Sequence, residues 1–363
     1  MQRRYFLKGA SALLGAKMLS MSSTSAKTKA EFYWPEETAP HERTFMQWPV
    51  NRKIHTDRVF LNMLQMTIAD IANTISEFEP VVMLMADKYQ ASAQRKLGKN
   101  VEIWNIATDD LWCRDSGPLF VTDGNGKLAI AHLKFNGWGN KQRHANDGKI
   151  TKRVAQRMGV ELINSGLTGE GGGIETDGNG TLLAHESCWV NPNRNTMDRE
   201  AIGRRLKRAL GAQKIIWAPG LKGADITDYH IDTLVRFVRP GEVVIQLPAE
   251  QDKGDPWSLA AFETYNTIRA EKDANGQQIE IIVLPEPRKT RIKTDDFVAS
   301  YVNYYACNGA IIMPQFGDRK ADAEAKSILK RLYPDRDIVA LNIDPIGEIG
   351  GGIHCATQQQ VKV

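Results

Sequence analysis

TDGNG, residues 122–126, occurs again without change as residues 176–180. Each copy lies between two short runs of strand-forming residues, and an Asp-Gly or Asn-Gly pair in that position is typical of a hairpin turn. Such turns are common enough for two identical copies to arise by chance. Because further matches surround both copies, we interpret them as parts of an internal repeat.

Polar residues precede each of the predicted hairpins. Arg114-Asp115 stands before the first, Glu170-Gly171-Gly172 before the second, and His230-Ile231-Asp232 before the strand-like TLVRFV and an Arg239–Glu242 turn. About five ββαβ units around a shared centre would bring these residues to one site, as strand-end residues do in other cyclic folds. The repeat therefore predicts an α/β fold of the propeller type.

Hydrophobic periodicity supports a mixed α/β architecture. Apolar residues at steps of three and four predict amphipathic helices at 57–78, 197–210 and 320–332. Short apolar or alternating runs predict strands at 81–86, 101–104, 281–284 and 310–314. Because no low-complexity linker divides residues 31–363, we expect this range to form a single domain.

Composition excludes several classes of protein. With 42% hydrophobic and 25% charged residues among 363, the chain is neither disordered nor collagen-like. Its four cysteines form no CxxC pair, and its histidines show no ligand spacing relative to them, so we expect no metal and no other cofactor. Cys113, Cys188 and Cys307 stand among aromatic or small residues and are predicted to be plain buried thiols.

Residues 1–26 predict a twin-arginine export signal, with Arg3-Arg4 ahead of an apolar run and a cleavage-like Thr24-Ser25-Ala26. A basic N-terminal arm is the alternative. The apolar run is shorter than the ~20 residues of a membrane span, so we expect a periplasmic or secreted protein with no membrane anchor after cleavage. This segment also carries the whole formal net charge of +4, and the neutral remainder argues against nucleic-acid binding.

GGGIHC, residues 350–355, contains the strongest catalytic candidate. Its three glycines permit a close backbone approach and unusual dihedral angles, and a cysteine delivered by such a turn is a candidate nucleophile. The reactive thiolate form of Cys355 would require a cationic neighbour or a helix N-terminus. The alternative is a glycine-rich turn with an inert cysteine.

His230 and Asp232 are one residue apart, so their side chains face the same way if the segment is extended. A carboxylate so placed raises the pKa of a histidine and orients it for acid–base work, although isolated histidines are more often structural. Asp115 and Glu170 lie in turns, where an ion pair or a cap is the simpler role. Three carboxylates beside a histidine and a cysteine would suit a guanidinium substrate, since carboxylates bind this planar cation in bidentate fashion.

Six blocks together resemble the agmatine deiminase and bacterial peptidyl-arginine deiminase family. They are PHERTFMQWP (40–49), WCRDSGP (112–118), EGGGIETDGNGTLL (170–183), NPNRN (191–195), YHID (229–232) and GGGIHCATQQ (350–359). The resemblance covers nearly all of the chain beyond residue 26. It implies the five-bladed, pseudo-symmetric α/β propeller called the pentein fold, and a homodimer is a further expectation from the family.

The resemblance also implies roles for individual residues. Cys355 would be the nucleophile, His230 the general acid and base, and Asp115 and Asp232 the clamps on the guanidinium, with Glu170 as a further acid. Two more residues, Trp112 and Gly352, would join these carboxylates in binding the substrate.

The expected reaction is hydrolysis of agmatine to N-carbamoylputrescine and ammonia through a covalent amidino-thioether. Deimination of peptidyl or free arginine is the first alternative, and an amidinotransferase or a non-catalytic protein that binds cationic metabolites are the others. Tyr229 stands where agmatine-specific members carry a glycine, and we expect it to narrow or reshape the pocket. After export the thiol of Cys355 must stay out of reach of the other three cysteines.

Overall fold

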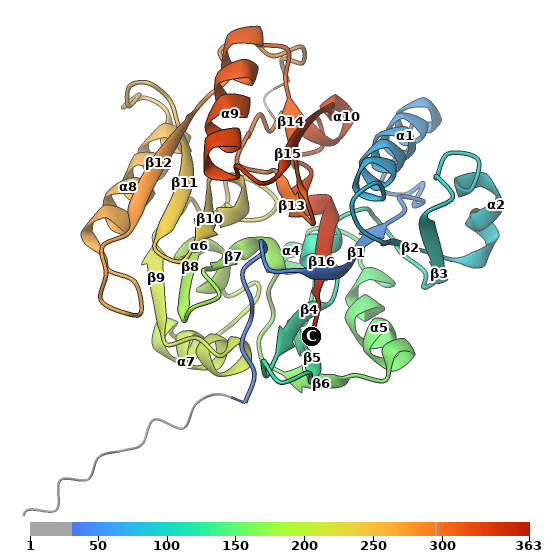
Figure 1. Cartoon of the computed structure of the whole chain (residues 1–363), viewed down its shortest axis with the longest axis horizontal. Helices are drawn as coiled ribbons and strands as arrows, with labels where there is room; N and C mark the ends of the chain where they lie inside the picture. Colours follow the sequence, from blue (N-terminus) through green and yellow to red (C-terminus); the bar gives the residue numbers. More distant parts are fainter. Residues whose placement is uncertain (1–30, 295) are drawn as a thin grey trace, which may run out of the picture.

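The computed structural model describes residues 31–294 and 296–363, which form five small β-sheets arranged around a common centre (Figure 1). The predicted export signal, residues 1–26, lies outside the described residues. Among the helices of the described part, none is long and apolar enough to cross a membrane.

The strands lie in the inner part of the molecule and the longer helices lie outside them. The strands are β1 (His41–Gln47), β2 (Val81–Met85), β3 (Val101–Asn105), β4 (Leu119–Thr122), β5 (Leu128–His132), β6 (Glu161–Asn164), β7 (Ile174–Thr176), β8 (Thr181–His185), β9 (Lys214–Ala218), β10 (Val235–Arg239), β11 (Glu242–Leu247), β12 (Glu280–Pro285), β13 (Tyr305–Cys307), β14 (Ala310–Gln315), β15 (Asp337–Asn342) and β16 (Thr357–Val361). The longer helices are α1 (Arg58–Ile75), α5 (Ile150–Met158), α7 (Arg199–Leu210), α8 (Pro256–Ala270) and α9 (Arg319–Leu332), and the short ones are α2 (Gln90–Ala93), α3 (Cys113–Ser116), α4 (Gly137–Asn140), α6 (Glu186–Trp189) and α10 (Asp344–Gly347).

Each sheet is built on a ββαβ unit, as the repeat predicted. In the sheet β4-β5-β6, the first two strands form an antiparallel hairpin, and β6 pairs parallel with β5 after α5. The sheets β7-β8-β9, β10-β11-β12 and β13-β14-β15 have the same pairing, with α7, α8 and α9 in their crossovers. Parallel neighbours require such crossovers. The predicted propeller, helices and strands are confirmed.

The two TDGNG copies adopt the same turn. Backbone φ is 76° and 98° at Gly124 and Gly126, and 67° and 101° at Gly178 and Gly180. In both copies the aspartate accepts two backbone N–H bonds across the turn. Because positive φ disfavours any residue with a Cβ atom, the same two glycines recur in both hairpins.

The remaining sheet, β16-β1-β2-β3, closes the ring. β16 is the last strand in the sequence, yet it pairs antiparallel with β1, the first. In this pair Gln358 lies opposite Phe45. β2 then pairs parallel with β1 after α1. The last strand therefore completes the first unit, and the ring cannot open without loss of these strand hydrogen bonds.

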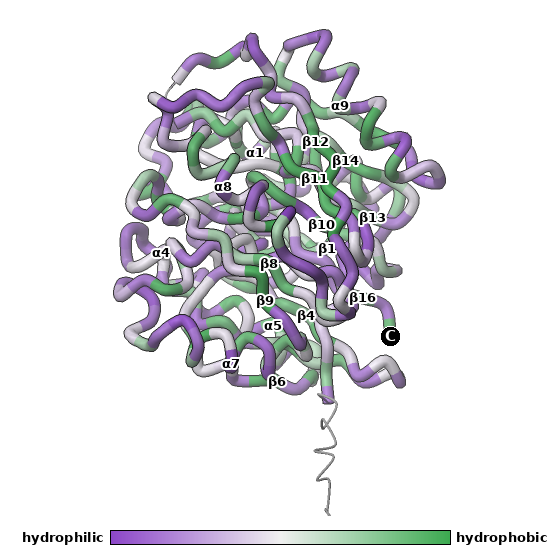
Figure 2. Tube along the Cα trace, turned by 90° about the vertical axis from the view of Figure 1, so that its left-hand side faces the viewer, coloured by the Kyte–Doolittle hydropathy of each residue, from purple (hydrophilic) through white to green (hydrophobic). Residues whose placement is uncertain are grey.

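Helix α1 shows how the outer layer is attached. Leu64, Ile68, Ile71 and Ile75 recur at steps of three and four and are fully buried, the pattern of a helix with one face against a sheet. Asp57 caps the first turn by accepting two backbone N–H bonds. In Figure 2 the apolar colour is concentrated in inner strands such as β8, β11 and β14.

A network of buried ions joins the sheets at the centre of the ring. Glu37 forms ion pairs of 2.9 Å with Arg114 in α3, with Arg236 in β10 and with His354 just before β16. Arg236 also lies 2.8 Å from Glu175 in β7. Burial favours the neutral form of Glu37, but Arg236, His354 and Arg114 hold its pKa well below the usual value. One carboxylate thus contacts basic side chains from three different units of the ring.

We expect Glu37→Gln to lower the free energy of unfolding by about 3 kcal/mol or more, because it leaves buried cations without their counter-ion. Thermal or denaturant unfolding would show this as a lower midpoint. Glu31→Gln is the matched control, since the pair of Glu31 with Lys127 is exposed and worth less than about 1 kcal/mol. Equal midpoints for the two variants would contradict the central role of Glu37.

Candidate active site

Polar turns just before the first strand of a sheet bring the predicted catalytic residues together. Asp115 lies in α3 before β4, Glu170 lies before β7, His230 and Asp232 lie before β10, and Cys355 lies before β16. All five side chains are buried. The structure therefore brings together the residues that the repeat predicted to converge.

His230 lies between two carboxylates. Its Nδ1 is 3.6 Å from Asp115 Oδ1, and its Nε2 is 3.4 Å from Glu170 Oε2. Cys355 lies beside the third carboxylate, with Sγ 3.6 Å from Asp232 Oδ2. The five residues thus form one continuous cluster.

Asp115, His230 and Asp232 converge on Gly172, and we call this meeting point the cradle. A Cβ atom at Gly172 would lie 2.8 Å from Asp115 Oδ1, 2.8 Å from His230 Nδ1 and 3.1 Å from Asp232 Oδ2. Asp232 Oδ1 is buried and has no hydrogen-bond partner among the described residues. Since an unsatisfied buried acceptor is costly, this oxygen is suited to an incoming N–H donor. A planar cation in the cradle would contact two carboxylates and the imidazole.

The prediction that Asp232 orients His230 is wrong. Residues Ile231–Thr233 form a single 3-10 turn instead of an extended strand, so the alternation of side chains does not apply. Asp232 Oδ2 binds His354 Nδ1 at 2.7 Å, and this hydrogen bond keeps the pKa of Asp232 below its usual value in spite of burial. Asp115 and Glu170 are the acids that contact His230.

Asn303 is a site residue that sequence reasoning missed. Its Nδ2 donates to Cys355 Sγ at 3.3 Å and to the backbone oxygen of Asp232 at 3.1 Å, and its Oδ1 accepts from Cys355 N at 3.3 Å. Asn303 precedes β13 and so holds the equivalent place in the fifth unit. The Asn308-Gly309 hairpin turn is the signal that could have found it, by counting back to the polar residue before the strand.

Arg194 supports Glu170 from the NPNRN block, to which sequence reasoning assigned no role. Arg194 Nε is 2.9 Å from both oxygens of Glu170, and Nη1 is 2.7 Å from Asp228 Oδ2. Although burial favours the neutral acid, His230 and Arg194 together lower the pKa of Glu170. Glu170 therefore stays ionised beside the imidazole.

Neighbouring carboxylates help to raise the pKa values of both Asp115 and His230. Burial, with the charges of Asp232 and Glu170, raises the pKa of Asp115 to about 6, against the lowering effect of His230. Burial opposes the imidazolium, but Asp115 and Glu170, followed by Asp232, raise the pKa of His230 to about 9. At neutral pH these values describe an ionised Asp115 and a protonated His230.

Cys355 has no cationic neighbour of the kind that the sequence led us to expect. Within the described residues its Sγ contacts Asn303 and the anionic Asp232. Burial, followed by the charges of Asp232 and Asp115, raises the pKa of the Cys355 thiol well above its usual range. Without a bound cation the sulfur is therefore a thiol.

The two further residues predicted to bind substrate lie on either side of Cys355. Trp112 packs so closely on Gly351 that a Cβ there would be 2.3 Å from its ring, and Gly352 lies against Asn303, where a Cβ would be 2.5 Å from Oδ1. Both glycines are thus required by close packing at the nucleophile. Direct contact of Trp112 and Gly352 with substrate stays a prediction.

Tyr229 occupies a position suited to glycine, with φ of 70°. Its ring packs against His185 and Trp257, with centroids 4.7 and 4.8 Å apart, in the hydrophobic core around β10 and β11. We find its bulk in this core, beside the cradle and not inside it. These contacts do not show the narrowing of the pocket that we expected from Tyr229.

The other three cysteines are buried and unpaired, as predicted, and Cys355 is unpaired too. Burial raises the pKa of Cys113, of Cys188 and of Cys307. All three are therefore inert thiols. Among the described residues, no group of three or more His, Cys, Asp or Glu side chains could hold a metal ion.

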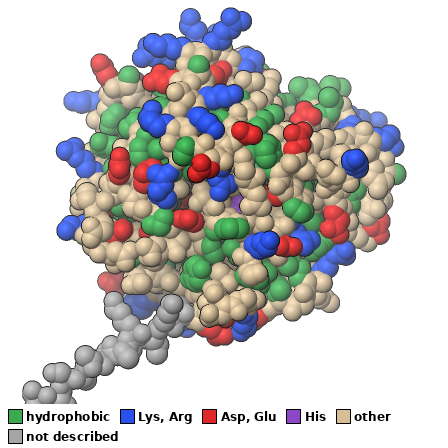
Figure 3. Space-filling view, in the orientation of Figure 1, with side chains coloured by type: hydrophobic (Ala, Val, Ile, Leu, Met, Phe, Trp, Pro, Cys, Tyr) green, Lys and Arg blue, Asp and Glu red, His purple; other side chains and the backbone are tan. Residues whose placement is uncertain are grey.

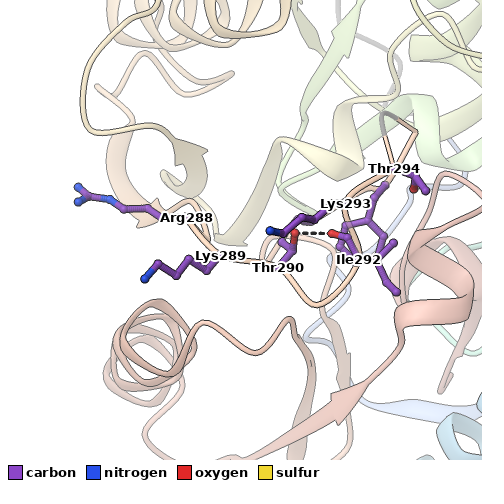
Figure 4. A pocket seen from close by; sticks show the side chains of 8 residues that line it. Arg288, Lys289, Thr290, Ile292, Lys293 and Thr294 are labelled. Atoms are coloured by element: carbon purple, nitrogen blue, oxygen red, sulfur yellow. Dashed lines mark hydrogen bonds between the residues drawn. The ribbon is translucent and has the colours of Figure 1, made fainter.

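A separate cavity of about 550 Å³ lies in the connection between β12 and β13. Figure 4 shows the side chains of Arg288, Lys289 and Lys293 extending to one side of this loop. Three cations would repel a guanidinium, so we do not place the substrate there. Elsewhere on the face seen in Figure 3, acidic and basic side chains are interspersed.

Comparison with known proteins agrees with this geometry. The family model described as Porphyromonas-type peptidyl-arginine deiminase matches residues 33–360. The agmatine deiminase of Medicago truncatula is 33% identical, covering 92% of this chain and 97% of its own, and that of Stutzerimonas stutzeri is 33% identical, covering 93% and 97%. The structure of agmatine deiminase of Enterococcus faecalis superposes with a TM-score of 0.84 at 27% identity, covering 92% of this chain and 96% of its own. The chain belongs to the Porphyromonas-type peptidyl-arginine deiminase family, with the pentein fold.

Proposed function

We propose that this protein hydrolyses agmatine to N-carbamoylputrescine and ammonia, with Cys355 as the covalent nucleophile. The observation that carries the proposal is the cradle at Gly172, where Asp115, His230 and Asp232 converge on a residue that has no Cβ atom. Relatives of similar length that bear the name agmatine deiminase support the choice of substrate.

The substrate itself supplies the positive charge that the thiol lacks. Asp115 and Asp232 raise the pKa of Cys355, and a guanidinium bound between them offsets both negative charges. The thiol proton then leaves to solvent, and the thiolate attacks a carbon that the carboxylates hold in place. Because the thiolate forms only when the cation is bound, a free thiolate is not exposed to oxidants between turnovers.

His230 moves the remaining protons. Its imidazolium protonates the departing amino group, which leaves as ammonia and gives an amidino-thioether on Cys355. Neutral His230 then takes a proton from water, and the resulting hydroxide attacks the same carbon. Collapse of this second adduct expels the sulfur, which recovers its proton from the adduct hydroxyl, and releases the ureido product.

Burial of the site favours a small substrate over a protein-bound arginine. Cys355 and Asp115 are each only 7% exposed, and His230 is 3% exposed. A free metabolite can be enclosed completely, whereas a peptide backbone must stay outside. Deimination of peptidyl or free arginine, the alternative suggested by the family name, is distinguished by the first assay below.

We also propose that the protein is exported by the twin-arginine route and acts in the periplasm or outside the cell. Arg3-Arg4, the following apolar run and the small residues up to Ala26 support this proposal. We further propose that the protein forms a homodimer, as expected from the family.

The mature protein should release ammonia from agmatine, and Cys355→Ala should abolish this release because no covalent adduct can form. Ammonia would be measured with agmatine, free arginine and an arginyl peptide as separate substrates. Ammonia from the peptide but not from agmatine would replace our substrate assignment. Undiminished turnover by Cys355→Ala would refute the mechanism, and product formation only with an added amine acceptor would indicate an amidinotransferase.

Gly172→Ala should reduce kcat/KM for agmatine by at least tenfold, since the new Cβ would stand in the cradle within 2.8 Å of Asp115 and His230. The melting temperature should fall as well, because the buried Asp115 and His230 side chains must shift to make room for the Cβ atom. Gly241→Ala is a useful contrast: its φ of 79° predicts lower stability with normal kinetics. Normal agmatine kinetics in Gly172→Ala would place the guanidinium elsewhere.

Replacement of Arg3 and Arg4 by lysine should keep the protein in the cytoplasm, because the paired arginines are what the export pathway reads. Cell fractionation followed by the ammonia assay would show activity moving from the periplasmic or secreted fraction to the cytoplasmic one. An unchanged distribution would rule out this route.

A further inference from the structure

A short turn outside the catalytic cluster reaches both acids that contact His230. In α4, which follows β5, Trp138 Nε1 donates to Asp115 Oδ2 at 2.8 Å. Just after α4, Lys141 Nζ lies 2.8 Å from Asp228 Oδ2. Asp228 binds Arg194, which holds Glu170 as described above.

We propose that residues 138–141 act as a brace with two arms, in which Trp138 positions Asp115 and Lys141 positions Glu170 through Asp228 and Arg194. Both are positioning residues, since they act on the substrate only through these carboxylates. The proposal rests on the proposed function for its kinetic readout.

The first arm fixes the carboxylate of Asp115 at both oxygens. Oδ2 accepts from Trp138, while Oδ1 accepts from Gly172 N at 3.1 Å. The Trp138 ring is itself buried and packs edge-on against Phe135, with centroids 5.1 Å apart. Asp115 therefore cannot rotate away from the cradle without breaking a hydrogen bond.

The second arm ties two loops together across the site. Besides Asp228, Lys141 Nζ donates to the backbone oxygens of Asp225 at 3.3 Å and Ile226 at 3.0 Å. These residues belong to the loop that leads directly into His230. Asp228 has φ of 61°, so the loop is held in the left-handed region by its polar contacts.

The brace keeps its shape at a conformational cost. Trp138 has φ of 55° and Asn140 has φ of 62°, the left-handed region that side chains with a Cβ adopt at a cost of order 1–3 kcal/mol. Asn136 Oδ1 accepts from Gly139 N at 2.8 Å, and Gly139 packs so tightly that a Cβ would lie 2.6 Å from Asn193. Such strain persists only where surrounding contacts enforce it, and here it aims the indole N–H at Asp115.

The Trp138 arm affects the charge of Asp115 as well as its orientation. The ionisable groups that act on Asp115 are His230, Asp232 and Glu170, and the indole N–H stabilises the carboxylate against the burial that raises its pKa to about 6. Without this donor the pKa of Asp115 rises further. The acid limb of kcat/KM, which requires ionised Asp115, then moves to higher pH.

The test compares Trp138→Phe with Trp104→Phe in the full-length protein. Trp104 also donates to a carboxylate, Glu102, at 2.7 Å, but it lies in β3 outside the site. We expect Trp138→Phe to lower kcat/KM for agmatine roughly 10- to 100-fold at pH 6, the effect of losing a hydrogen bond to a charged group, with partial recovery at pH 8. Trp104→Phe should keep the wild-type profile. A loss in Trp138→Phe that is equal at every pH would overturn the positioning role, because it would indicate general damage to the fold.

Lys141→Met tests the second arm, with Lys127→Met as its control, since Lys127 also pairs with two carboxylates but on the surface. We expect Lys141→Met to lower kcat/KM several-fold, because Asp228 and Arg194 then hold Glu170 less firmly. Wild-type kcat/KM in Lys141→Met would overturn the second arm. If wild type releases no ammonia from agmatine, the proposed function fails, and the same comparisons on the guanidinium that it does hydrolyse still test the brace.

Discussion

The ion pairs of Glu37 set the geometry on which the rest of the ring depends. A carboxylate buried with Arg114, Arg236 and His354 has given up its hydration, and only contacts of hydrogen-bonding length compensate for that loss. The three basic side chains come from different units of the ring, so their distances from one oxygen pair determine how closely the units approach. His354 also contacts Asp232, so the position of Asp232 depends on that of Glu37. Asp232 in turn borders both the cradle and Cys355.

The propeller makes a polar centre possible because each unit exposes the same place to it. The turn before a first strand is short and buried. Asp115, Glu170, Asp232, Asn303 and Cys355 all occupy this one place in their units. The repeat therefore fixes the positions of these side chains while leaving the residue type free.

The sequence predicted the fold and the convergence of the five candidate residues, because the signals were local. Identical turns, helical periodicity and the GGGIHC and YHID blocks each occupy fewer than about 20 neighbouring residues. What it missed depends on partners far apart: Glu37 and Arg114 are separated by 77 positions, and Asn303 and Cys355 by 52. The error at Asp232 was local, since an alternating pattern was assumed where the chain makes a 3-10 turn. The sequence placed carboxylates near Cys355, but it did not predict that burial and these carboxylates would raise the pKa of the thiol.

The pairing of β16 with β1 links closure of the ring to the position of Cys355. Cys355 stands directly before β16, so the strand that completes the ring is also the one that delivers the sulfur. Without β16 the first sheet would be unfinished, and the turn that carries Cys355 would have no strand to hold it beside Asn303 and Asp232. Closure of the ring and the position of the sulfur therefore depend on the same strand.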